Sequence, residues 1–106
     1  MAKELNQLYE LINERRNANV ETSYTAKLFA AGTPFIARKV GEEAVETVVS
    51  ALGNSKQNLI SESADLLYHL LVLWADADID PQSVWKELKD RRGTSGLDEK
   101  LNRITT

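Results

Sequence analysis

The chain has 106 residues, of which 42% are hydrophobic and 27% are charged. These values are ordinary for one globular domain and argue against a disordered chain. The 13 basic and 16 acidic residues give a net charge of −3, and no basic cluster suggests a nucleic-acid surface. Because the sequence has no cysteine, disulfides, thiolate metal sites and cysteine nucleophiles are excluded.

Targeting signals are missing from the N-terminus, which has no apolar signal region. The longest apolar run, Leu70 to Ala75, is too short to span a bilayer. We therefore expect a single domain over residues 1–106, in a cytoplasmic protein that binds neither membranes nor nucleic acid.

Helical patterns occur along the whole chain, whereas the alternation typical of strands is absent. Apolar residues recur at helical spacing in the segment 3–16, and a polar loop is expected over 17–23. Ser23 is a plausible N-cap for a short helix over 24–31, which Gly32 would end.

Two long helices are expected next. Thr33-Pro34 suggests an N-cap followed by proline at the first helical position, for a helix that runs to about Leu52. Gly41 lies inside it, where glycine costs roughly 1 kcal/mol relative to alanine, so we expect close approach of another backbone or of a ligand. The second long helix is expected over about 57–77.

Asp80-Pro81 marks the start of a further helix, expected over about 81–92. A break follows at 93–96, and 97–104 is expected to form a short turn or helix. The sum is an all-α bundle of four to five helices.

Acidic residues mark one face of each long helix. With about 100° per residue, Glu43 and Glu46 lie ~60° apart with Lys39 between them, and Glu62 and Asp65 are also ~60° apart. Glu42 lies on the same face of the first long helix as Glu43 and Glu46. The short connection between the helices favours antiparallel neighbours, so the two acidic stripes can face each other.

Carboxylates around one gap suit Mg²⁺, or Mn²⁺, with several waters retained and substrate phosphates as further ligands. Such a metal polarises phosphoryl groups and activates water. The simpler alternative is that both stripes are solvated helix faces. Lys39 could likewise only pair with Glu42 or Glu43, although such a pair does not prevent contact with a phosphate.

The pattern Glu42-Glu43-x-x-Glu46 followed by Glu62-x-x-Asp65 resembles the signature of the MazG-type all-α NTP pyrophosphohydrolases. Those enzymes use Mg²⁺ to cleave between the α- and β-phosphates of a nucleotide. By motif position, the resemblance implies the metal ligands Glu43, Glu46, Glu62 and Asp65. It gives catalytic roles to Glu42, Glu43 and Glu46, with Glu42 as a ligand or as the base that activates water.

The flanking segments 23–32, 38–46, 62–73 and 91–100 resemble the phosphoribosyl-ATP pyrophosphatase family within this MazG-like superfamily. The resemblance implies hydrolysis of phosphoribosyl-ATP to phosphoribosyl-AMP and pyrophosphate, the second step of histidine biosynthesis. It also implies a homodimer, which fits the nearly all-round apolar second half of the 57–77 helix. Ser63 stands where many relatives have Glu or Ala, but this position lies outside the acidic stripe of its helix.

Six residues are candidates for binding the substrate: Tyr24, Arg38, Lys39, His69, Arg91 and Arg92. The guanidinium groups suit phosphate oxygens, although the last two arginines could only complement a helix dipole. His69 could be a structural hydrogen-bonding residue, a partner that orients a ligand carboxylate, or a phosphate contact. The break at 93–96 could wrap a phosphate or be a plain loop.

Two other functions stay open. One is a housekeeping enzyme of the same superfamily that removes unwanted nucleoside triphosphates, because the metal chemistry would be identical. The other is a non-catalytic helical dimer whose acidic stripes hold a structural cation or a basic partner.

Overall fold

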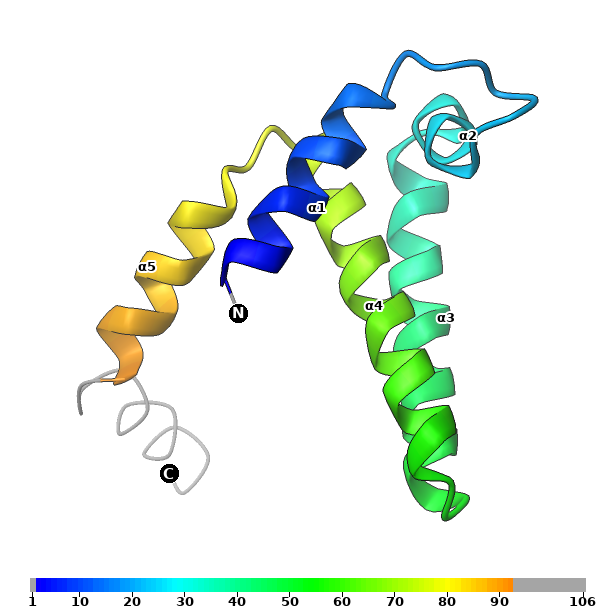
Figure 1. The fold of residues 1–106 in the computed structure, drawn as a ribbon, viewed down its shortest axis with the longest axis vertical. Coiled ribbons are helices and arrows are strands. Elements are labelled where there is room, and N and C mark those ends of the chain that lie inside the picture. Colours follow the sequence, from blue (N-terminus) through cyan, green and yellow to red (C-terminus); the bar gives the residue numbers. More distant parts are fainter. Residues whose placement is uncertain (1, 93–106) are drawn as a thin grey trace.

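The computed structural model of the chain describes residues 2–92 (Figure 1). Within that part of the chain the protein is all-α, as the sequence predicts, with five helices and no strand. The helices are α1 (Ala2–Glu14), α2 (Tyr24–Ala31), α3 (Thr33–Leu52), α4 (Lys56–Asp76) and α5 (Pro81–Arg92). The break predicted at 93–96 and the element predicted at 97–104 lie outside the described residues.

Helices α3 and α4 form a long antiparallel hairpin, as their short connection predicts (Figure 1). The chain reverses through Asn54, whose φ of 65° lies in the left-handed region that asparagine tolerates better than most residues. Ser55 then caps α4, since its hydroxyl accepts a hydrogen bond from the Asn58 amide at 3.2 Å. This hairpin carries every acidic residue of the predicted site.

The junction between α2 and α3 is tighter than the sequence suggests. Ser23 caps α2 as predicted, accepting from the Ala26 amide at 3.2 Å. The N-cap predicted at Thr33 is wrong, because α3 already begins at that residue. Gly32, with φ of 94°, both ends α2 and precedes α3, so a single left-handed residue makes the turn. The Thr33 hydroxyl instead donates to Asp76 Oδ2 at 2.5 Å, at the far end of α4.

The core lies at one end of the hairpin, where α1 and α2 cover it. Its members come from four helices and are almost completely buried: Ile12, Leu28, Ile36, Leu71, Val72 and Ala75. The Arg16 guanidinium lies 4.8 Å from the centre of the Phe29 ring and donates to the Ala75 carbonyl at 3.0 Å. It thereby ties the loop after α1 to the C-terminal end of α4.

Helix α5 packs through aromatic contacts at the edge of the molecule away from α3 (Figure 1). The Trp74 and Trp85 rings meet edge to face at 5.7 Å, and the Trp85 indole donates to Asn6 Oδ1 at 3.1 Å. Tyr9 donates to the Ile79 carbonyl at 2.8 Å. No helix among the described residues is long and apolar enough to cross a membrane.

No backbone from the described residues 2–92 approaches Gly41 closely, so this part of the prediction is wrong within that range. A Cβ placed on Gly41 would meet none of those residues within 4 Å, because this side of α3 faces outward. The adjacent apolar face is also partly open, with Val48 58% exposed. Whatever Gly41 accommodates therefore lies outside the described part of this chain.

Candidate metal centre

The two predicted acidic stripes do face each other. Glu43 on α3 and Glu62 and Asp65 on α4 each offer a carboxylate oxygen, and the three oxygens lie within 4.8 Å of one another. Spacing of three residues places Glu62 and Asp65 on one face of α4, and antiparallel packing brings Glu43 across from them. We call these three residues the acidic cluster.

Two oxygens of the acidic cluster have no hydrogen-bond partner in the described part of the chain. These buried atoms are Glu43 Oε2 and Glu62 Oε2, and Glu43 is only 7% exposed. A buried carboxylate oxygen without a partner is costly, and a bound cation would satisfy it. Oxygen ligands from several carboxylates suit Mg²⁺ or Mn²⁺, so the residues present fit such an ion.

Crowding of negative charge is also visible in the acid strength of Glu62. Burial raises the pKa of this carboxyl, and a hydrogen bond with the Glu46 carboxyl raises it further. The charges of Glu46, Asp65 and Glu43 act in the same direction. Glu46 thus lies beside the acidic cluster, although it does not join the three oxygens that converge.

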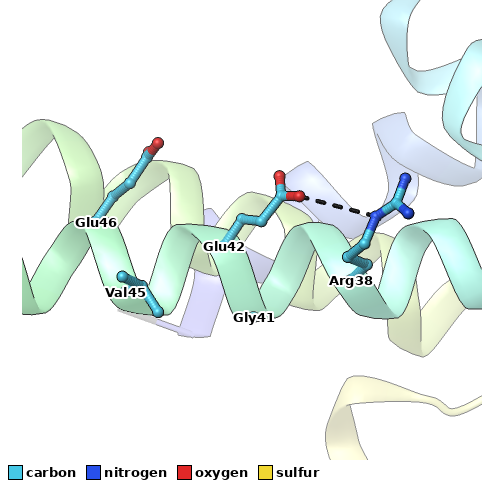
Figure 2. A pocket seen from close by; sticks show the side chains of 5 residues that line it. All are labelled: Arg38, Gly41, Glu42, Val45 and Glu46. Carbon is cyan, nitrogen blue, oxygen red and sulfur yellow. Dashed lines mark ion pairs between the residues drawn. The ribbon is translucent and has the colours of Figure 1, made fainter.

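Glu46 also lines an open hollow on the outer side of α3. Figure 2 shows Arg38, Glu42 and Glu46 projecting from one side of the helix, with Gly41 and Val45 along the same stretch. The hollow has a volume of about 520 Å³. Its charged rim and its contact with Glu46 connect it to the acidic cluster.

Two basic side chains border the carboxylates. Lys39 Nζ lies 3.3 Å from Glu42 Oε2 and 3.7 Å from Glu43 Oε1. The hydrogen bond with Glu42 is the main cause that raises the pKa of Lys39, which keeps the ammonium charged. Arg38 Nε lies 3.8 Å from Glu42 Oε1 (Figure 2), with its guanidinium 5.1 Å from the centre of the Phe35 ring. The structure therefore brings Lys39 to the acidic cluster through Glu43, whereas Arg38 reaches only the neighbouring Glu42.

Tyr24 and His69 also meet close to the cluster. The Tyr24 hydroxyl lies 2.9 Å from His69 Nε2, and His69 Nδ1 lies 2.7 Å from the Asp65 carbonyl oxygen. Burial is the main cause that raises the pKa of Tyr24, which Lys39 opposes. Weaker contributions from the Glu43 and Asp65 charges show that the phenol is close to the carboxylates.

Sequence reasoning missed Thr47. Its hydroxyl donates to the Glu43 carbonyl at 2.7 Å and lies 3.4 Å from the Glu62 carbonyl, between two members of the acidic cluster. The available signal was its position, four residues after Glu43 and on the same helix face. Threonine in mid-helix commonly bonds the carbonyl four residues earlier, so the sequence alone did not single it out.

Arg91 and Arg92 are not brought to the acidic cluster. Both lie in the last turn of α5, which Figure 1 shows at the edge of the molecule away from α3. Arg91 Nε pairs with Glu87 Oε1 at 3.0 Å within its own helix. Their predicted contact with substrate has no support within one described chain, and it stays a prediction.

Comparison with known proteins was made on the whole chain. A family model described as phosphoribosyl-ATP pyrophosphohydrolase matches residues 5–92. A phosphoribosyl-ATP pyrophosphatase of Paramagnetospirillum magneticum is 58% identical over 102 residues, which cover 96% of this chain and 94% of the relative. The protein of the same name from Azospirillum brasilense is 59% identical over 96 residues, covering 91% and 86%. The one from Rhizorhabdus wittichii is 50% identical over 103 residues, covering 97% of both.

Proposed function

Because the chain belongs to the phosphoribosyl-ATP pyrophosphohydrolase family, we propose that it hydrolyses phosphoribosyl-ATP to phosphoribosyl-AMP and pyrophosphate. This is the second step of histidine biosynthesis, and we place it in the cytoplasm. The observation that carries the proposal is the acidic cluster, with two buried oxygens that lack partners and basic side chains at its border.

The acidic cluster would hold Mg²⁺, with Mn²⁺ as a substitute. Glu43, Glu62 and Asp65 would supply ligand oxygens, and Glu46, which touches Glu62, would join them at the open edge. Bound there, the ion would neutralise phosphate charge and polarise the phosphoryl group. Filling the site would also satisfy the two oxygens that lack hydrogen bonds.

The remaining groups would bind phosphate and move a proton. Lys39 presents its ammonium next to Glu43 of the cluster, and Arg38 lies beside Glu42 with a guanidinium whose geometry suits phosphate oxygens. Glu42 and Glu46 flank the cluster on α3 and are the two proposed acceptors for the proton of the attacking water. The two cations already pair with Glu42, so phosphate binding would compete with that pairing and release its carboxylate.

The test is pyrophosphate release in the presence of Mg²⁺, with phosphoribosyl-ATP, ATP and the deoxynucleoside triphosphates compared at equal concentration. We expect phosphoribosyl-ATP to be strongly preferred. Glu46→Gln and Asp65→Asn should each lower kcat by about 100-fold or more, since electrostatic groups of this kind contribute that much. Glu10→Gln removes an exposed carboxylate on α1 and serves as the control.

Outcomes separate the competing functions. Preference for deoxynucleoside triphosphates would replace the proposed substrate but retain the chemistry. No pyrophosphate release from any substrate would favour the non-catalytic helical dimer. Full activity in both acidic variants, with their fold intact by circular dichroism, would remove the metal site from the proposal.

We also propose a homodimer, formed through the outer face of α3. Val45, Val48, Val49 and Leu52 share one helix face and are 63%, 58%, 63% and 80% exposed. A contiguous apolar face of this kind usually marks an interface. Gly41 continues the same face one turn earlier and leaves room for a packed helix.

The homodimer is tested by light scattering after size exclusion. We expect a dimer for the wild type and a monomer for Val48→Glu/Leu52→Glu. Leu88→Glu, which places one glutamate on an exposed leucine of α5, is the control for either single substitution and should stay dimeric. A monomeric wild-type protein at micromolar concentration would refute the proposed interface.

A further inference from the structure

Tyr24 and His69 form a partly buried hydrogen bond, and the second partner of the imidazole indicates its direction. The Asp65 carbonyl can only accept, so His69 Nδ1 must carry the hydrogen that it donates over 2.7 Å. In the neutral ring, Nε2 is then an acceptor, and the Tyr24 hydroxyl donates to it over 2.9 Å. Both ring nitrogens of His69 are therefore used within the protein.

His69 is also closed off from any ligand. Its side chain lies against Tyr24 and Tyr68, whose rings meet the imidazole edge to face at 5.8 and 5.1 Å. The residue is 5% exposed, whereas Tyr24 is 50% exposed. Tyr24 therefore offers surface that a ligand could contact, whereas His69 offers almost none.

A second hydrogen bond lies directly beside the first. Thr25 Oγ1 and the Tyr68 hydroxyl are 2.5 Å apart, and Thr25 is 7% exposed. Two consecutive residues of α2 therefore bond to two consecutive residues of α4. The contact is made one turn after Asp65, a member of the acidic cluster, and α2 is held there as a unit.

We infer that His69 is a positioning residue: it holds Tyr24, and with it the start of α2, against the turn of α4 that carries Asp65. Substrate then contacts the exposed part of Tyr24 and does not contact His69. The inference rests on the proposed function for the identity of the substrate. It separates the roles of two residues that the sequence offered alike as substrate contacts: His69 holds Tyr24, and Tyr24 meets the substrate.

The test is a double-mutant cycle with Tyr24→Phe, His69→Asn and both together. Phenylalanine keeps the ring of Tyr24 without its hydroxyl. Asparagine can still donate to the Asp65 carbonyl, but it offers Tyr24 no acceptor at the same place. Lys27→Ala, on the exposed side of α2, is the matched control and should leave every parameter unchanged.

Each single variant should raise KM for phosphoribosyl-ATP about tenfold with kcat within about twofold, the size expected for one lost hydrogen bond. The KM of the double variant should be no higher than that of the more impaired single variant, because the effects of residues that act as a unit are not additive. Multiplying effects, or a much larger loss in His69→Asn than in Tyr24→Phe, would show that His69 meets the substrate by itself. Unchanged KM in both variants would equally overturn the inference.

A measurement that needs no turnover separates this inference from the proposed function. Amide hydrogen exchange in residues 24–31 should accelerate in both single variants and stay unchanged in Lys27→Ala. If the wild-type protein does not hydrolyse phosphoribosyl-ATP, the proposed function fails while the exchange result still decides whether the pair holds α2. Unaltered exchange in both variants would refute the positioning role even in an active enzyme.

Discussion

The two halves of the α3–α4 hairpin are built from similar residues but are buried very differently. Near α1 and α2, Ile36, Leu71 and Val72 are at most 1% exposed. Toward the turn, Leu52 is 80% and Ile60 is 62% exposed. The acidic cluster lies between these halves. Burial here depends on which helices cover the hairpin, so the half that forms the core is distinct from the half that carries the proposed dimer interface.

The largest expected effect is the difference in stability between the same leucine-to-alanine substitution made in each half of the hairpin. Leu71→Ala removes a side chain that is 1% exposed from the covered half and should cost about 2–5 kcal/mol in the free energy of unfolding. Leu52→Ala makes the same chemical change in the open half and should cost less than about 0.5 kcal/mol in the monomer.

Urea unfolding of both variants measures the difference, in a Val48→Glu background that light scattering first has to show to be monomeric. That background removes the contribution of the proposed interface at Leu52. Equal losses would show that the open half is as important to the fold as the covered half, and would contradict the comparison.

An intermediate effect is expected at Thr47, on the boundary between the halves. Thr47→Val keeps the shape but loses the hydroxyl that donates to the Glu43 carbonyl, which should cost about 1 kcal/mol. Because the same hydroxyl lies near the Glu62 carbonyl, Mg²⁺ affinity should also fall, by about 10-fold as for other groups that support ligands.

Calorimetric titration with Mg²⁺ alone measures that affinity, and Thr47→Ser is the control, since it restores the hydroxyl. A serine variant as weak as the valine variant would show that the methyl group, and not the hydrogen bond, matters.

The sequence predicted the helices and the facing carboxylates because both follow from local spacing. Glu62 and Asp65 share a face whatever surrounds them, and a short connection forces α3 and α4 to be antiparallel. Tertiary contacts could not be predicted in this way. The contact of Tyr24 with His69 has no periodic signal, because it depends on how α2 packs on α4. The approach of Thr47 to the Glu62 carbonyl has none either, because it depends on how α3 packs on α4.

Thr33 shows a similar limit at a helix end. A threonine before proline predicts an N-cap, and the structure uses Gly32 instead because its left-handed φ turns the chain in one residue. Arg91 and Arg92 show the limit of resemblance. A motif assigns them to the site, but within the described chain α5 does not approach the acidic cluster (Figure 1).

The smallest effect is a change in how stability depends on pH, and it tests the boundary most directly. The pKa of Glu62 is raised by burial and by its acidic neighbours, so folding favours the protonated carboxyl. Without metal, stability is therefore greatest below the ordinary glutamate pKa of about 4.3 and falls as pH rises through the raised value.

In Glu62→Gln this loss of stability with rising pH should disappear. In the wild type, Mg²⁺ should reduce the loss only above that pH range, where the carboxylate is ionised. Thermal unfolding from pH 4 to 8, with and without Mg²⁺ and with Glu10→Gln as control, measures this, and parallel profiles for wild type and Glu62→Gln would show that the cluster carries no electrostatic cost.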